Sequence, residues 1–132
     1  MQAYPEIKHF VQEILGCSCP EEVFNEIVCQ KGGLGIWEQK VTVGGRLLIY
    51  IMTLDRKSDI QGIINAALNE GVAEREKKGF NRFRLVLVTP GPHELHRPAE
   101  CAFERSEYTD EKTHLHVVRE SDVEGLWMPD NR

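Results

Sequence analysis

A run of apolar residues at helical spacing places the strongest constraint on how this chain can fold. The apolar positions recur every third or fourth residue over about three turns, which predicts a helix with one apolar face. The stripe consists of Ile60, Ile63, Ile64, Ala67, Leu68, Gly71 and Val72. Ser58 or Asp59 can cap the start of this helix, and Gly79 can end it. Because such a face must be buried, the rest of the chain has to supply a second layer.

Strand patterns flank this helix on both sides. Before it, apolar and polar residues alternate over residues 37–43, and residues 47–52 are almost wholly apolar. Gly44-Gly45 lies between these two runs and predicts a two-residue hairpin turn that needs positive φ. After the helix, residues 83–88 predict a third strand. The order strand, helix, strand is typical of a right-handed crossover that joins parallel neighbours.

Other segments complete the predicted fold. Residues 114–119 (HLHVVR) predict a short fourth strand, and residues 5–15 predict an amphipathic helix. The run from 90 to 112 has no periodicity and is expected to form a long loop, while residues 126–132 are expected to form a tail.

A second N-terminal helix is expected to begin at Cys19, with Pro20 in its first position. Its predicted buried stripe consists of Val23, Phe24, Ile27 and Val28. Together these elements predict one domain over residues 1–132, in the α+β class. The expected architecture is a two-layer sandwich, a four-stranded mixed sheet with helices mainly on one face. The length of 132 residues suits a single core.

Charge and hydropathy limit the possible partners. Sixteen Lys and Arg against 21 Asp and Glu give a net charge of -5, which disfavours nucleic acid and anionic lipid as main partners. Arg82 and Arg84 on one predicted strand make too small a basic patch to change this expectation. The sequence contains neither an apolar run of membrane-spanning length nor a secretion-signal pattern at its start, so we expect a cytoplasmic protein with no membrane contact. Its four cysteines would then be reduced thiols.

Two of these cysteines form a CxC pair at the start of the second predicted helix. Cys17 and Cys19 would lie where backbone N–H groups and the helix dipole stabilise a thiolate, which suggests a redox or metal site. Glu21 and Glu22 place negative charge beside any thiolate there and oppose this interpretation. The structural alternative makes Cys19 a helix cap and Cys17 a small buried contact.

The segment around these cysteines also carries a resemblance. Residues 15–24 (LGCSCPEEVF) resemble a segment of small prokaryotic proteins of unknown activity. The resemblance implies that the cysteine-proline helix start is shared by a group of proteins. It implies no activity, cofactor or catalytic residue.

Histidines form the second candidate site. His114 and His116 alternate on one predicted strand and therefore point to the same face of the sheet. Such an HxH pair could bind zinc with a third ligand from His93, His96 or Cys101, and an open position would suit a metal-assisted hydrolase or a metal sensor. The structural alternative is a set of solvated histidines in a loop and at a sheet edge.

Two functions of different class follow from these features. The preferred one is a non-enzymatic accessory or protein-interaction domain, which would meet a protein partner or a second copy through the long loop and the apolar pair Trp127 and Met128. The alternative is a metal or thiol-redox protein that uses the CxC pair or the histidines.

Overall fold

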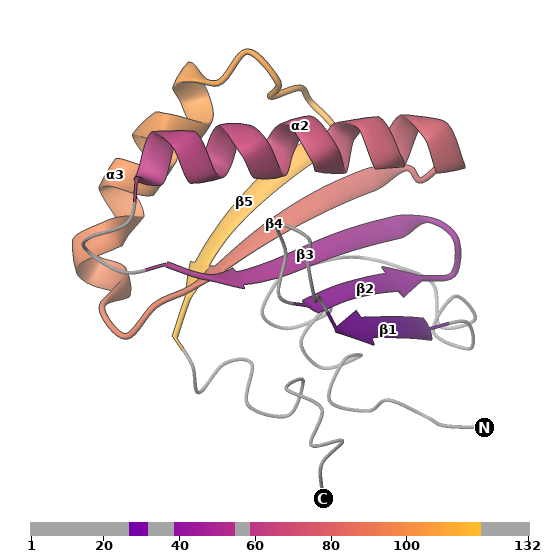
Figure 1. Cartoon of the computed structure of the whole chain (residues 1–132), viewed down its shortest axis with the longest axis horizontal. Helices are drawn as coiled ribbons and strands as arrows, with labels where there is room; N and C mark the ends of the chain where they lie inside the picture. The colour runs from indigo at the N-terminus through magenta and orange to yellow at the C-terminus, as the bar shows by residue number, and fades with distance from the viewer. Residues whose placement is uncertain (1–26, 32–38, 55–58, 120–132) are drawn as a thin grey trace, which may run out of the picture.

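The computed structural model describes residues 27–31, 39–54 and 59–119 of the chain. Seven helices and strands lie within these ranges (Figure 1). In chain order they are β1 (Ile27–Lys31), β2 (Gln39–Val43), β3 (Leu47–Thr53), α2 (Ile60–Lys78), β4 (Arg82–Val88), α3 (Pro92–Arg105) and β5 (Thr113–Val118).

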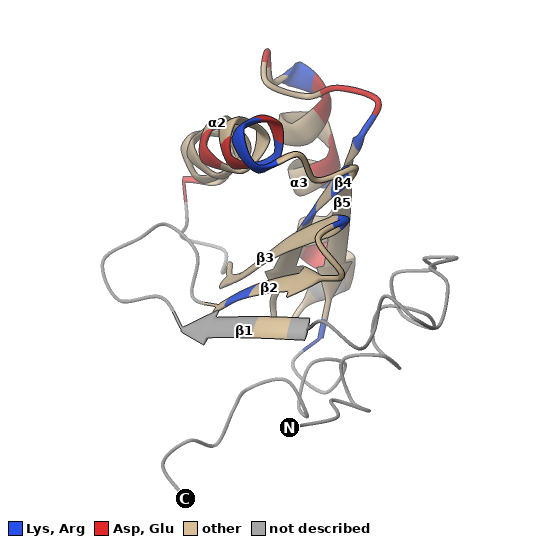
Figure 2. Cartoon of the chain, turned by 90° about the vertical axis from the view of Figure 1, so that its right-hand side faces the viewer, with Lys and Arg blue, Asp and Glu red and all other residues tan. Residues whose placement is uncertain are grey.

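The strands form one mixed sheet in the order β1-β2-β3-β4-β5. The first three strands pair antiparallel, and β3, β4 and β5 pair parallel. Both described helices lie on the same side of this sheet, in Figure 1 and again in the turned view of Figure 2. The predicted α+β class and mixed sheet are confirmed, and the two-layer arrangement is compatible with the described residues. The four predicted strands are β2 to β5, and β1 extends the sheet by a fifth strand.

The predicted hairpin and its turn are present between β2 and β3. Gly44 and Gly45 have φ values of 60° and 66°, the left-handed region that glycine enters without a Cβ clash. The Arg46 N–H donates to the Val43 carbonyl at 3.0 Å and closes the turn. This turn brings β2 back alongside the apolar strand β3.

Helix α2 begins and ends where its capping residues predict. The Asp59 side chain accepts a hydrogen bond from the Gly62 N–H, and Gly79 adopts a left-handed conformation after the last turn. In the middle of the helix Gly71 lies directly against the ring of Phe83 on β4. A glycine at this point lets the helix approach the sheet closely.

The predicted long loop over residues 90–112 is wrong for most of its length. Residues Pro92–Arg105 form α3, with Pro92 in the first turn and Pro98 inside the helix. An interior proline removes a backbone hydrogen bond, so the segment looks like a helix breaker in sequence. Packing of Leu95, Ala99 and Ala102 into the core stabilises the helix in spite of Pro98.

The predicted second helix is also wrong where the structure describes it. Ile27 and Val28 were expected in its buried stripe, but both lie in β1, which pairs with β2. The side chain of Val28 is 55% exposed. β-branched residues suit a strand as well as a helix stripe, and here pairing with β2 decides the outcome. The rest of that helix and the predicted helix over 5–15 lie outside the described residues.

The two sides of the sheet differ in their neighbours. On the helix side, side chains of β3 and β4 pack with α2 and α3 around Tyr50 and Phe83, whose rings meet edge to face at a centroid distance of 4.8 Å. Successive residues of a strand point to opposite faces, so Ile49, Arg84 and His116 point to the other side, called the far side below. Apolar residues of the far side over β2 to β4 are also buried, and they are Val41, Val43, Leu47, Ile49, Ile51, Val86 and Val88. Neither helix in the described part of the chain is long and apolar enough to cross a membrane.

Candidate functional site

Strand β5 is one edge of the sheet. Among the described strands it pairs with β4 alone, and its middle residues, from His114 to Val117, are half-buried. By contrast, the central strand β3 is buried from Leu47 to Met52. A partly exposed edge strand is the part of a sheet that can accept another strand.

The hydrogen bonds between β4 and β5 show which backbone groups face outward. The Phe83 N–H donates to the Lys112 carbonyl and the Thr89 N–H donates to the Val118 carbonyl, each at 3.0 Å. In a parallel pair these bonds recur at every second residue, so the backbone groups of His114 and His116 face β4. The N–H and C=O groups of Leu115 and Val117 therefore point away from β4.

The far side of β4 and β5 carries a group of basic side chains. Arg84 lies opposite His114 in the register of the two strands, and its Nη1 lies 2.9 Å from Nε2 of His116. Arg82 precedes Arg84 on the same side of β4 and is exposed. We call Arg82, Arg84, His114 and His116 the basic cluster.

The contact between Arg84 and His116 sets the protonation of the ring. A guanidinium group only donates hydrogen bonds, so Nε2 of His116 must accept, and the ring must be neutral with its proton on Nδ1. Burial, with smaller contributions from Arg84 and His114, lowers the pKa of His116 to about 4. Burial also lowers the pKa of His114, with Arg84 as the next cause. The charge of the basic cluster at neutral pH therefore comes from its two arginines.

This geometry does not support the predicted zinc site. Nε2 of His116 is engaged by Arg84, and the positive charge of the guanidinium group disfavours a bound cation. Within the described ranges, no group of three or more His, Cys, Asp or Glu side chains could hold a metal ion.

The proposed third ligands lie on another element. His93, His96 and Cys101 belong to α3, which packs on the helix side of the sheet, whereas His114 and His116 point to the far side. His93 and His96 are exposed, and Cys101 is a half-buried free thiol. The five predicted ligands are thus divided between the two sides of the sheet.

The remaining predicted site residues lie outside the described residues. These are the thiol candidates Cys17 and Cys19, and the apolar pair Trp127 and Met128. The CxC interpretation stays a prediction.

Two polar networks fix helix α2 to the sheet and were not predicted. In the first, Glu74 of α2 accepts hydrogen bonds from Tyr50 Oη at 2.6 Å and from Lys40 Nζ at 2.7 Å. Lys78 Nζ also donates to it, at 3.0 Å. Burial alone would raise the pKa of Glu74, but the bonds from Lys40, Tyr50 and Lys78 outweigh it and lower that pKa to about 2. Burial and the bond to Glu74 raise the pKa of Tyr50.

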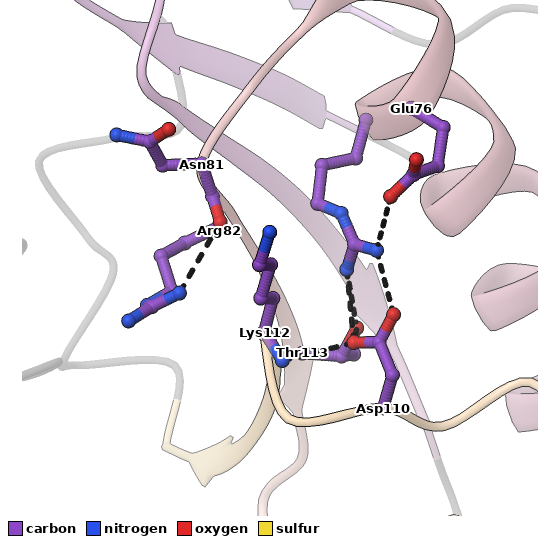
Figure 3. A network of polar contacts seen from close by, with 7 residues as sticks. Glu76, Asn81, Arg82, Asp110, Lys112 and Thr113 are labelled. Carbon is purple, nitrogen blue, oxygen red and sulfur yellow. Dashed lines mark hydrogen bonds and ion pairs between the residues drawn. The ribbon is translucent and has the colours of Figure 1, made fainter.

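The second network anchors the start of β5 (Figure 3). Arg75 of α2 is only 3% exposed and binds both carboxylate oxygens of Asp110, at 3.0 and 2.6 Å. The same guanidinium group donates to Thr113 Oγ1 at 3.0 Å and to Glu76 at 2.7 Å. The bond from Arg75 holds the pKa of Asp110 well below its usual range, and the bond from Thr113 adds to this effect. Helix α2 therefore holds β5 in place at its first residue.

Sequence reasoning identified the histidines of the basic cluster but set its arginines aside. A basic residue between Phe83 and Leu85, inside an otherwise apolar strand, is the signal that could have drawn attention to Arg84. The register of β4 and β5 brings the two arginines next to the two histidines. This register cannot be predicted from the sequence of either strand alone.

No known protein family, curated protein or solved structure matches this chain. The geometry and chemistry of the site therefore have to carry any functional conclusion.

Proposed function

We propose that this protein is a non-enzymatic interaction domain that binds an extended segment of a partner protein along β5. The observation that carries the proposal is the half-buried edge strand whose Leu115 and Val117 backbone groups point away from β4. An extended segment placed there would continue the sheet and gain main-chain hydrogen bonds, as in other cases of strand addition.

The contacts that hold β5 in place favour this role. Arg75 and Asp110 hold Thr113 at the beginning of the strand, and the Thr89 N–H bonds to Val118 at its end. Leu115 and Val117 also pack against the core formed with the helices. An edge held at both ends loses little conformational freedom on binding, which favours affinity.

The opposite edge of the sheet is less suited to a partner strand. Strand β1 is five residues long and ends in Lys31, and a charged residue on an edge opposes pairing with another chain. Val28 is the β1 residue whose side chain the structure describes, and an exposed valine of this kind is common on protein surfaces.

A titration with an uncharged probe peptide tests the proposal. Acetyl-Val-Thr-Val-Thr-Val-Thr-amide has high strand propensity, and we expect it to shift the amide resonances of residues 113–118 and leave residues 27–31 unchanged. Shifts that are absent from 113–118, or that centre on another element, would contradict the proposal.

A pair of variants separates backbone from side-chain effects. Val117→Pro removes one outward N–H, and Val117→Ala removes a similar part of the side-chain packing while keeping that N–H. We expect Val117→Pro to abolish peptide binding and Val117→Ala to retain it. Equal loss in both variants would show that side-chain packing, and not strand addition, accounts for the binding.

A further inference from the structure

We propose that the segment bound along β5 alternates acidic and apolar side chains, with its acidic residues next to the basic cluster. This inference rests on the proposed function and specifies the partner of the same edge.

The two sides of β5 offer different surroundings to an added strand. On the far side, its nearest neighbours would be His114 and His116, with Arg84 one strand further in. On the helix side, its neighbours would be Leu115 and Val117, which are partly buried against the core. Side chains directly opposite one another on neighbouring strands lie within about 5.5 Å, so each side of the added strand meets the chemistry of β5.

Charge complementarity determines which residues suit the far side. Arg82 and Arg84 supply positive charge there, and both belong to the strand next to β5. Neutral His114 and His116 add polar ring nitrogens, for which a carboxylate is a better neighbour than an apolar group. The attraction is local, because the whole chain carries a net charge of -5 and repels acidic partners elsewhere.

On the helix side, the added strand requires apolar side chains. An added residue beside Leu115 and Val117 would extend the apolar layer that these residues share with the core. A strand alternates its side chains between the two faces, so an acidic residue at every second position leaves the intervening positions apolar. The fitting pattern is therefore acidic-apolar-acidic-apolar.

Two charged peptides test this pattern at low ionic strength. Acetyl-Val-Glu-Val-Glu-Val-Glu-amide should bind at least tenfold more tightly than acetyl-Val-Lys-Val-Lys-Val-Lys-amide, as measured from the shifts of residues 113–118. The advantage should decrease as salt is added, because exposed charges are screened.

Substitutions identify the source of the preference. Arg84→Gln and, separately, the exposed Arg82→Gln should each lower the preference for the acidic peptide at least threefold. Arg97→Gln on α3 removes the same charge from an exposed position on the helix side and should leave the preference unchanged. An amide spectrum of each variant checks that it is folded. If Arg84→Gln does not fold, Arg82→Gln provides the test.

The possible outcomes separate the two proposals. Equal binding of both charged peptides at β5 would overturn the acidic pattern and leave the interaction function standing. Tighter binding of the lysine peptide would overturn the pattern as well. Failure of these peptides and of the uncharged probe to reach β5 would overturn the interaction function itself.

Discussion

Replacing Glu74 with glutamine should weaken the attachment of helix α2 to the sheet, and so lower the free energy of unfolding, while preserving the shape of the side chain. The amide oxygen can still accept the hydrogen bond from Tyr50, but the amide nitrogen cannot accept from Lys40. The Lys40 side chain is only 11% exposed, so its ammonium group would lose the Glu74 carboxylate at a position with little access to water.

The expected loss follows from this burial. Removing one partner of a fully buried ion pair costs about 3–5 kcal/mol. The pair here keeps some contact with water, since Glu74 is 13% exposed and Lys40 is 11% exposed. The second pair, with the half-exposed Lys78, contributes about 0.5 kcal/mol or less. We therefore expect Glu74→Gln to lower the free energy of unfolding by about 2–3 kcal/mol.

Urea unfolding at pH 7 measures this loss, with Glu100→Gln on the exposed face of α3 as the matched control. The midpoint should fall in Glu74→Gln with little change of slope, and it should barely move in the control. The folded-state pKa of Glu74, about 2, lies below its ordinary value of 4.5, so its contribution is complete above about pH 4.5 and is lost as the pH falls toward 2. The difference between wild type and Glu74→Gln should shrink over that interval. A loss at pH 7 no larger than that of Glu100→Gln would refute this role of Glu74.

Three further changes test other parts of the fold. Gly71→Ala should destabilise the protein by about 1–3 kcal/mol in thermal or urea unfolding, although alanine favours helices, because the new methyl group would collide with the ring of Phe83; a gain in stability would contradict the close approach. Asp110→Asn should cost about 2 kcal/mol, because it removes one of the two carboxylates that pair with the buried Arg75 and leaves it only the exposed Glu76. Since that bond depresses the pKa of Asp110, wild type should lose the stabilisation as the pH falls below 3.8, and an unfolding series that shows the same acid dependence in both proteins would contradict this assignment. Gly45→Ala should cost about 1 kcal/mol in the same unfolding assay, because alanine is strained at a φ of 66°; an unchanged midpoint would contradict the turn geometry.

The middle of the fold could be predicted because local and long-range preferences agree there. Three segments there favour a single structure each. They are the glycine turn at 44–45, the apolar strand after it and the apolar stripe of α2. The caps at Asp59 and Gly79 lie where their side-chain chemistry and backbone freedom predict them. The parallel pairing of β3 with β4 follows from the helix between them.

The segments that were predicted wrongly are those in which tertiary contacts determine the secondary structure. Helix α3 has a narrow stripe built partly of alanines, and Pro98 interrupts its sequence pattern. Strand β1 owes its conformation to its pairing with β2, which the spacing of Ile27 and Val28 does not indicate. A one-residue shift of register would turn every side chain of a strand to the other face, so sequence alone could not bring Arg84 next to His116.

Amide hydrogen exchange along β5 in the free protein tests the central claim most directly. The open edge predicts alternation: the amides of His114 and His116, which face β4, should exchange slowly, and those of Leu115 and Val117 should exchange at least tenfold faster. Equally slow exchange at all four amides would mean that the edge is already paired, and it would contradict the account of β5 as a binding strand.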